Sequence, residues 1–471
     1  MIRARDALLL AVLAAVLFVW PLHAPPITTR GEAREAMVVR DMARSGHWVL
    51  GYRLGVVASK PPFYHWLALL PVRVVGPSAA AVRLPSALGA WTMAAATLAG
   101  GTALGGPATG WLAVGVLAAT RLFWESALEA RVDMVFAAAV TVALAAFLCW
   151  WRGSRAAPPI ACWAAMTCAV LTKGPAGAVV PALVIVTFLA LERQLGLLRR
   201  LWSWPAALAS AAVVLGWYGL AWRTGGRQFV AVQLLRENVD RLVGTGAFHA
   251  RRQRVLSLLK LEGAFAVHLF PWSLVVPWSL WRWWRGERED AGGRFLHVWW
   301  VVVLATFSVA AGKRGVYLLP LYPPIALLVA RVLAPVVARG GWRARGVVAG
   351  VLALALVAAV GVQALRVRRA HRDAGLVAFA REVQRLVPAG VPLRAVRTFD
   401  EDDYVTLGWL LDRPLERTDV ACPPGAFVLE PGARTNEPAI VAASERRGRR
   451  LRLRRCAATP VSARPGPPPT A

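Results

Sequence analysis

The sequence predicts an α-helical polytopic membrane protein that ends in a small α/β domain outside the membrane. Three observations lead to this fold class. First, 57% of the 471 residues are hydrophobic and only 17% are charged, and the apolar residues form runs of about 17–25, the length that spans a bilayer as a helix. Second, the 22 tryptophans suit the two membrane–water interfaces. Third, beyond about residue 370 shorter helix-like and strand-like patterns replace the long apolar runs.

The first apolar run extends from Ala7 to about Leu22 and follows Arg3 and Arg5. No small-x-small cleavage site follows and further apolar runs come later, so we expect an uncleaved transmembrane helix rather than a signal peptide. Because basic residues favour the cytoplasmic side, the chain is expected to emerge outside near Pro25.

A polar stretch of residues 25–77 comes next, and its segments 31–45 and 60–75 are amphipathic, as interfacial helices are. Ten further apolar runs bring the expected number of spans to about eleven. They fall at about 80–102, 107–124, 133–151, 157–172, 175–191, 203–222, 262–281, 296–312, 316–337 and 347–365. Arginines follow the positive-inside rule in most loops, although the outer loop 223–258 is basic too. An odd number of spans places the C-terminal residues outside.

We therefore expect a membrane domain of residues 1–369, a small α/β domain of residues 370–460 and a disordered Pro-rich tail of residues 461–471. In the small domain a helix is expected at Asp373–Leu386. Strands are expected at Leu393–Thr398, Ala426–Leu429 and Arg450–Arg455.

Two cysteines of the small domain, Cys422 and Cys456, are 34 positions apart and each lies beside a strand-like run. Adjacent strands bring Cα atoms within the distance that a disulfide requires, and an extracytoplasmic compartment permits the bond. We expect a Cys422–Cys456 disulfide, the alternative being two free buried thiols.

The net charge is +29, but the basic residues lie mainly between apolar runs. Lipid head groups or lipid-linked phosphates are therefore the expected partners, and nucleic acid is not. Lysine occurs only four times against 51 arginines, at Lys60, Lys173, Lys260 and Lys313. A genome that favours arginine codons explains the ratio, yet each lysine is of interest because its ammonium is a compact point charge.

Acidic residues are scarce before residue 370, and most lie with basic residues at the outer ends of expected spans. The acids are Glu32, Glu35, Asp41, Glu125, Glu129, Asp133, Glu237, Asp240 and Glu262, and the bases are Arg34, Lys60, Arg131, Lys173, Arg241, Lys313 and Arg314. Ionisable groups at membrane depth are candidates for function. Their position at one surface indicates a reaction face rather than a permeation path.

Three groups of motifs carry a resemblance to a known family. The first is Gly31-Glu32-Ala33-Arg34-Glu35-Ala36, followed by Ser45-Gly46-His47-Trp48, Lys60-Pro61-Pro62-Phe63-Tyr64-His65-Trp66 and Val82-Arg83-Leu84-Pro85-Ser86. The second is Glu129-Ala130-Arg131-Val132-Asp133 and Leu171-Thr172-Lys173-Gly174-Pro175. The third is Glu237-Asn238-x-x-Arg241, Phe270-Pro271-Trp272 and Lys313-Arg314-x-x-Tyr317-x-Leu319-Pro320. In this order the motifs resemble the polyprenyl-phosphate-sugar-dependent glycosyltransferases of the GT-C fold, namely the lipid A aminoarabinose transferases and the related protein O-mannosyltransferases.

The resemblance covers roughly residues 1–330 and implies a GT-C fold, with the loop 25–77 forming part of the active site. It implies that Lys60, Arg241 and Tyr317, with Lys313, contact the donor phosphate. Residues expected to line the substrate cavity are Arg34, Tyr64, Arg131, Lys173 and Glu237. The implied activity moves a sugar from a polyprenyl-phosphate donor to a lipid, glycan or protein acceptor on the outer face of the inner membrane.

The first loop departs from the family pattern of an Asp-Glu pair followed by Arg-Tyr. Gly31 takes the place of the aspartate and Glu35 that of the tyrosine, whereas Glu32 and Arg34 match. If that aspartate were the sole base of the family, this chain would be inactive or would recruit a neighbouring carboxylate.

The chemistry explains these residue types independently. A sugar on a lipid phosphate already has a good leaving group, so the reaction needs a carboxylate to accept the proton of the acceptor and cations for the phosphate charge. We expect Glu32 to be the base, Glu35 its substitute, and Asp133 to orient the acceptor or share the proton transfer. No cofactor is required, no spacing indicates a zinc site, and the need for another divalent metal is left open.

Several of these residues also have structural interpretations. Glu32 and Arg34 could lie on a solvated helix face, Asp133 could cap a helix, and Lys173-Gly174-Pro175 could be only a turn. Lys313 and Arg314 could be interfacial anchors.

Two other functions compete with catalysis, an inactive relative that binds lipid-linked sugar and a transporter. ATP-driven transport is disfavoured because no phosphate-binding loop is present, and ion-coupled transport because the charges are not near mid-membrane.

Overall fold

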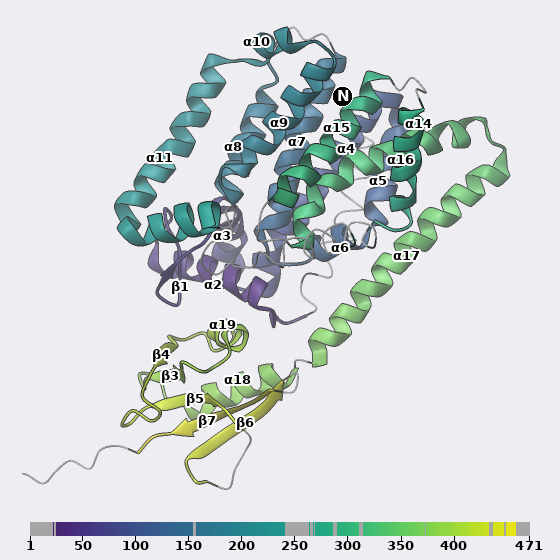
Figure 1. The fold of residues 1–471 in the computed structure, drawn as a ribbon. Coiled ribbons are helices and arrows are strands. Elements are labelled where there is room, and N and C mark those ends of the chain that lie inside the picture. The colour runs from purple at the N-terminus through teal and green to yellow at the C-terminus, as the bar shows by residue number, and fades with distance from the viewer. Residues whose placement is uncertain are drawn as a thin grey trace, which may run out of the picture. The chain divides into compact units, whose positions relative to one another are not determined.

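A computed structural model describes residues 22, 25–153, 157–240, 263, 267, 269–285, 290–309, 314–372, 374–432, 437–446 and 449–457 (Figure 1). These residues form two compact units. The first holds Leu22 and Val38–Val367, and the second combines Pro25–Met37 with the C-terminal residues from Arg368 onward. Helix α2 (Arg30–Ser45) begins in the second unit and ends in the first.

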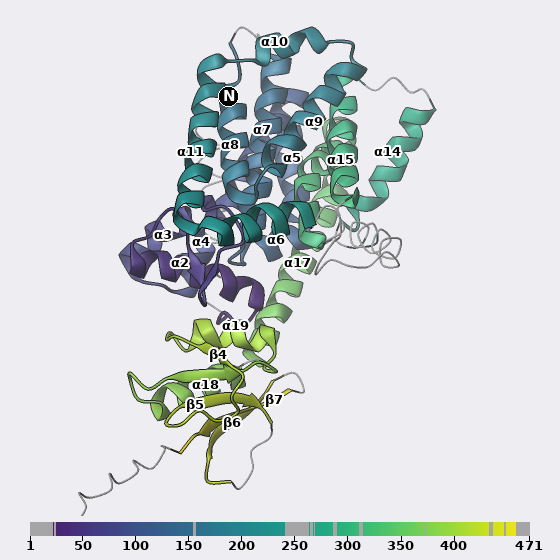
Figure 2. The same ribbon diagram turned by 60° about the vertical axis from the view of Figure 1, so that its left-hand side comes forward.

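The first unit is a bundle of helices, seen in two views in Figures 1 and 2. In chain order they are α3 (Phe63–Val75), α4 (Ala79–Gly105), α5 (Pro107–Ala118), α6 (Arg121–Ala127), α7 (Val132–Arg152), α8 (Ile160–Lys173), α9 (Ala176–Leu191), α10 (Leu198–Leu201), α11 (Trp204–Phe229), α14 (Val275–Trp284), α15 (Ala291–Val309), α16 (Tyr322–Arg339) and α17 (Trp342–Arg372). A short hairpin, β1 (Tyr52–Arg53) with β2 (Val56–Val57), precedes α3. A π-helix (Val230–Asp240) follows α11, and a 3₁₀ helix (Gly315–Leu321) precedes α16.

Five segments of the described chain are long and apolar enough to cross a membrane. They are Ala79–Gly105, Val132–Arg152, Trp204–Asp240, Ala291–Val309 and Gly315–Arg339. Apolar helices of 10–17 residues add Phe63–Val75, Pro107–Ala118, Ile160–Lys173, Ala176–Leu191 and Arg345–Ala358. Helices therefore occupy nine of the expected spans, and both expected interfacial segments are helical, as α2 and α3. The first expected span lies outside the described residues, apart from Leu22.

Three expected spans differ in detail from the helices found. The run 107–124 is divided between α5 and α6, because Thr120 donates a hydrogen bond from its hydroxyl to the Leu117 carbonyl where α5 ends. The run 203–222 continues as α11 to Phe229, whose ring packs on Trp217 at 5.9 Å between centroids. The described part of the run 262–281 becomes helical as α14 only from Val275, and most of its first half lies outside the described residues.

Helix α7 is the core of the first unit and packs against α4, α8 and α9. At its far end Phe147 meets Phe188 of α9 and Phe295 of α15, with ring centroids 6.1 and 5.5 Å away. Inside a bilayer, close packing of this kind holds helices together, because lipid tails are as apolar as the side chains they would replace. The packed core fixes the positions of the ends of α7, α8 and α15, where the charged residues lie.

The C-terminal part of the second unit contains a five-stranded sheet in the order β4-β3-β5-β7-β6. Strand β3 (Leu393–Val396) is parallel to β4 (Glu416–Thr418) and to β5 (Phe427–Pro431). Strand β7 (Arg449–Arg455) is antiparallel to β5 and to β6 (Ile440–Arg446). Helix α18 (Ala374–Leu386) packs on β6, and α19 (Glu401–Leu410) begins at Asp400, whose side chain accepts hydrogen bonds from two backbone N–H groups of the first turn.

The expected helix and all three expected strands of this part are found, as α18, β3, β5 and β7. The expected disulfide is confirmed: Cys422 and Cys456 are bonded, with Cα atoms 5.4 Å apart. The backbone places them together because β5 and β7 pair, and the Cys456 N–H donates to the Ala426 carbonyl.

Candidate active site

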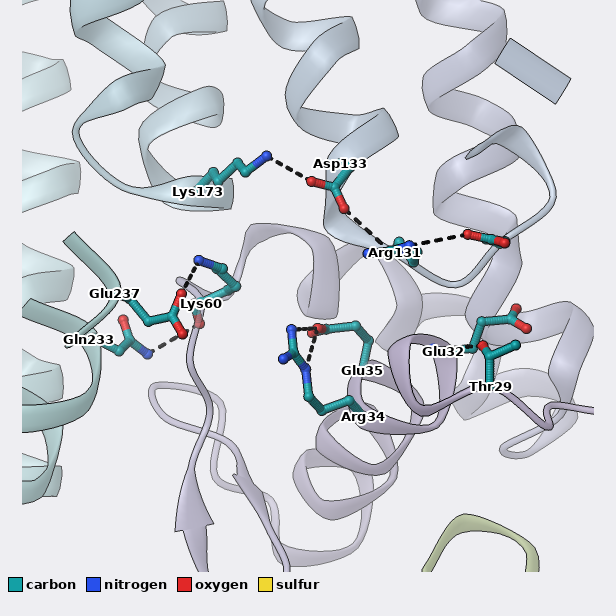
Figure 3. A network of polar contacts seen from close by, with 11 residues as sticks. Thr29, Glu32, Arg34, Glu35, Lys60, Arg131, Asp133, Lys173, Gln233 and Glu237 are labelled. Atoms are coloured by element: carbon teal, nitrogen blue, oxygen red, sulfur yellow. Dashed lines mark hydrogen bonds and ion pairs between the residues drawn. The ribbon is translucent and has the colours of Figure 1, made fainter. Parts of the chain in front are cut away.

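Lys60 lies just before α3 and forms an ion pair with Glu237 of the π-helix. The Lys60 Nζ donates to Glu237 Oε2 at 2.6 Å, and the two side chains are only 9% and 11% exposed. Gln233, one turn earlier, donates from Nε2 to the carbonyls of Ala58 and Lys60 at 2.7 and 3.1 Å. The π-helix therefore holds both the backbone and the ammonium group of Lys60 (Figure 3).

Asp133, in the first turn of α7, forms the centre of a second group of charges. Its Oδ1 accepts a hydrogen bond from Lys173 Nζ at 2.7 Å, and its Oδ2 lies 3.5 Å from Arg131 Nε. Arg131 also pairs with Glu129 at 3.5 Å, and its carbonyl accepts a hydrogen bond from Ser86 of α4. Asp133 and Lys173 are each less than 10% exposed, so their charges neutralise one another inside the bundle.

The turn between α8 and α9 fixes Lys173. Gly174 adopts φ +86°, a left-handed conformation that favours glycine. A Cβ atom at Gly177 would lie 2.3 Å from the Ala169 carbonyl carbon, so this position also requires glycine. Lys173-Gly174-Pro175 is thus a tight turn, as one interpretation of the sequence predicted. The turn also places the buried ammonium group of Lys173 against Asp133.

Aromatic rings enclose the other side of the Lys173 ammonium group. Its Nζ lies 4.0 Å from the ring centroid of Tyr317, 4.9 Å from that of Phe136 and 5.9 Å from that of Phe307. Ring faces attract cations at such distances. Tyr317, which the sequence placed near the donor phosphate, is therefore joined to Asp133 through one lysine.

A small cavity connects the two ion pairs. Its volume is about 10 Å³, roughly the room that one water molecule needs. The lining residues are Ser59, Lys60, Pro61, Lys173, Gly174, Tyr218, Gln233, Glu237 and Asn238. The sequence did not predict Tyr218 or Gln233, because neither lies in a motif that carries charge.

Glu32, Arg34 and Glu35 lie on the part of α2 that belongs to the second unit. Glu32 and Glu35 are both 5% exposed, so a solvated helix face, the alternative considered for Glu32 and Arg34, is wrong for Glu32. Arg34 reaches Glu35 with an Nη2–Oε1 distance of 3.1 Å, and the Glu32 N–H donates to Thr29 Oγ1 at 3.3 Å. In the same unit Arg30 pairs with Glu401 and Asp402 at the start of α19.

Of the remaining candidate residues, the structure describes Tyr64 but not Arg241 or Lys313. Tyr64 is fully buried and donates from its hydroxyl to the Val82 carbonyl, so its ring supports the start of α7 and does not line the small cavity. Arg241 and Lys313 lie outside the described residues. Within the described parts of the chain, no group of three or more His, Cys, Asp or Glu side chains is arranged to hold a metal ion.

A family profile described as dolichyl-phosphate-mannose-protein mannosyltransferase matches residues 59–218. An undecaprenyl phosphate-alpha-4-amino-4-deoxy-L-arabinose arabinosyl transferase of Erwinia tasmaniensis is 26% identical over 336 residues, covering 69% of this chain and 59% of the relative. One of Pseudomonas fluorescens is 29% identical over 375 residues, covering 75% and 63%. The chain thus spans about three-fifths of the length of these curated relatives.

Among solved structures, ArnT from Cupriavidus metallidurans bound to undecaprenyl phosphate aligns with a TM-score of 0.74 at 20% identity, covering 95% of this chain and 97% of ArnT. The chain has the GT-C fold. The archaeal oligosaccharyltransferase AglB from Archaeoglobus fulgidus shares it more distantly, with a TM-score of 0.56 at 14% identity over 90% of this chain and 69% of AglB. The expected fold class and the resemblance to GT-C glycosyltransferases of the aminoarabinose transferase type are confirmed, and the protein is a membrane protein with several spanning helices.

Proposed function

We propose that the protein is an integral membrane glycosyltransferase that moves a sugar from a polyprenyl-phosphate donor to a lipid, glycan or protein acceptor. We place the reaction and the C-terminal residues from 370 onward at the outer face of the inner membrane. The observation that carries the proposal is the shared cavity of Lys60 and Lys173, which lies in a fold that resembles undecaprenyl-phosphate-bound ArnT. The ammonium group of Lys60, which pairs with the Glu237 carboxylate, can bind a phosphate oxygen through the same kind of charge-assisted hydrogen bond.

In this proposal Lys60 binds the donor phosphate, assisted by Tyr317 and by Arg241 and Lys313. These groups stabilise the charge that grows on the phosphate as the bond from the anomeric carbon to the phosphate oxygen breaks. Glu32 accepts the proton of the acceptor, with Glu35 as its substitute. Asp133, held by Lys173 and Arg131, orients the acceptor.

The test is a turnover assay of the purified full-length protein with synthetic polyprenyl-phosphate sugars, measuring release of polyprenyl phosphate. Glu32→Gln should lower the rate by about 10²–10⁴-fold, the usual contribution of a general base. Glu382→Gln removes an exposed carboxylate of α18 by the same chemical change and should leave the rate unaltered. Near-normal turnover in Glu32→Gln would transfer the role of base to Glu35 or Asp133.

A second candidate function is supported by Gly31, which stands where the resembling family has an aspartate. A chain without that carboxylate could bind lipid-linked sugar and not transfer it. Such a protein would bind the donor with ordinary affinity and release no polyprenyl phosphate with any acceptor. Mass spectrometry of envelope glycans and lipids from cells with and without the protein identifies the acceptor if transfer occurs.

A further inference from the structure

We infer that Glu237 is an internal substitute for the donor phosphate: its carboxylate pairs with Lys60 and must leave before a phosphate can bind there. The inference rests on the proposed function, because it takes Lys60 as the cation that binds phosphate. It adds to that function a carboxylate latch, by which we mean the Lys60–Glu237 ion pair.

The geometry of the latch is that of a bound anion. The Nζ–Oε2 distance of 2.6 Å is that of a short charge-assisted hydrogen bond. With exposures of 9% and 11%, neither charge is compensated by bulk water. A carboxylate and a phosphodiester each carry one negative charge, so an exchange between them preserves the charge of the site.

The size of the cavity excludes simultaneous binding. A space of about 10 Å³ admits roughly one water molecule, so a phosphate enters only if a lining side chain moves. Glu237 is the one acid among the residues that line this cavity. Its charge would also repel a phosphate that shared Lys60 with it. The volume thus requires that a lining side chain move, and the charge selects Glu237 as that side chain.

The segment that carries Glu237 is built to release the side chain while keeping Lys60 in place. Gln233 binds the Ala58 and Lys60 carbonyls through its own amide, independently of the Glu237 carboxylate. The segment is a π-helix, a rare conformation that is frequent at functional sites. It follows a break in α11 at Gly226, where φ is +49°. Rotation of the Glu237 side chain thus breaks the Lys60–Glu237 ion pair without moving the backbone that positions Lys60.

The latch also affects the end of the reaction. Transfer converts the donor phosphodiester into a phosphate monoester, whose second ionisation strengthens its attraction to Lys60. Return of Glu237 to Lys60 competes with the product and helps to expel it. Removal of the Glu237 charge should therefore tighten the binding of both donor and product, and increase inhibition by the product.

The experiment measures the Kd of undecaprenyl phosphate for the full-length protein in lipid nanodiscs. Glu237→Gln should lower the Kd by about tenfold, because the fraction of sites open to phosphate rises. Glu237→Asp, whose shorter side chain cannot reach Lys60 as closely, should lower it by a smaller factor. Glu382→Gln, which makes the same chemical change at an exposed carboxylate of α18, is the matched control and should leave the Kd unchanged.

A second comparison uses Lys60→Met, in which the latch has no cation. Glu237→Gln should then bring no gain in affinity. A Kd that is unchanged or raised in both Glu237 variants would overturn the latch and make Glu237 a residue that positions Lys60. Failure of every variant to bind undecaprenyl phosphate would overturn the proposed function itself.

Discussion

In the first unit, the two ion pairs beside the cavity use lysine, one of them together with Arg131, whereas the pair at the end of α9 uses arginine alone. At the cavity, Lys60 pairs with Glu237 and Lys173 with Asp133, each through a single Nζ–oxygen contact, and all four side chains are at most 11% exposed. At the end of α9, Arg294 of α15 binds both oxygens of Glu192, at 2.6 and 2.7 Å, and remains 34% exposed.

The difference follows from the geometry of the two cations. A guanidinium binds a carboxylate through two parallel hydrogen bonds, which fixes the orientation of both groups. An ammonium carries three donors on a flexible stem and imposes no planar geometry, so it accepts a different anion at little geometric cost. The bidentate pair of Arg294 and Glu192 thus ties α15 to the end of α9, whereas Lys60, which we propose binds the donor phosphate, can exchange one anion for another. Both lysines in the described parts of the chain, Lys60 and Lys173, belong to the cavity.

A third ion pair, next to the start of α15, resembles the Arg294–Glu192 pair because it too joins two helices through an arginine. Arg331 of α16 donates a hydrogen bond to Asp290, which precedes α15, and the Gly293 N–H donates to the same oxygen. Burial raises the pKa of Asp290, but these hydrogen bonds outweigh it and hold the pKa below its usual value. The carboxylate therefore stays charged at any physiological pH.

The largest effect is expected for Asp133→Asn. The change leaves the Lys173 ammonium buried without its anion and removes the group that we propose orients the acceptor. Transfer should fall by about 10²–10³-fold, in the range found for other groups that act on the transition state. The assay is release of polyprenyl phosphate per folded molecule, with the double variant Asp133→Asn/Lys173→Met as control. If the double variant recovered activity, the pair would be structural like that of Arg294.

The stability contributed by the Cys422–Cys456 disulfide can be compared with that of the ion pairs. Replacing both Cys422 and Cys456 by Ser should lower the free energy of unfolding of the C-terminal part by roughly 3–4 kcal/mol, since the bond closes a loop of 34 residues. Denaturant-dependent hydrogen exchange of the backbone amides in β3, β5 and β7 measures it, and reduction of the wild type should give the same loss. Equal stability with and without reductant would contradict the bond.

Arg294→Met should destabilise the first unit without affecting chemistry. The variant leaves Glu192 unpaired, and because Arg294 is one-third exposed we expect a loss of about 2 kcal/mol rather than the full effect of a buried pair. Turnover per folded molecule should stay within roughly twofold of wild type. Arg294→Lys is the matched control and should recover only part of the stability, because it restores charge without the second hydrogen bond. A large loss of turnover in Arg294→Lys would show that the Arg294–Glu192 pair affects catalysis as the lysine pairs beside the cavity are proposed to do.

The smallest effect is expected for Arg30→Ala. Its ion pairs with Glu401 and Asp402 are about half exposed, and exposed pairs contribute roughly 0–1 kcal/mol. Thermal unfolding of the variant should therefore differ little from that of wild type. The charge-reversal pair Arg30→Glu with Glu401→Arg serves as its control. A loss well above that of Arg294→Met would show that exposure does not determine the strength of these pairs.

Long apolar runs and strongly alternating strands could be predicted from the sequence, because each carries its own periodicity. Strands β4 and β6 and helix α19 were missed. β4 has only three residues and forms by pairing beside β3, and β6 includes a register shift near Ala442. Neither feature leaves a pattern in the local sequence.

The candidate site was predicted in part for a similar reason. Charged residues in short motifs, such as Lys60, Asp133 and Lys173, could be singled out from their scarcity and position. Their partners could not be assigned, because the pairs Lys60–Glu237 and Asp133–Lys173 join residues 177 and 40 positions apart. The π-helix, and with it the role of Gln233, depends on packing that no single segment encodes.

The second unit combines residues made early in translation with residues made last, which affects when it can form. Arg30 and Glu401 are 371 positions apart, so the start of α2 is made among the first residues and its partners among the last. During nearly the whole of translation the partners of Arg30 are therefore not yet made, although the end of α2 already has the first unit to join. A chain released before residue 401 would therefore lack the ion pairs that join the start of α2 to the start of α19.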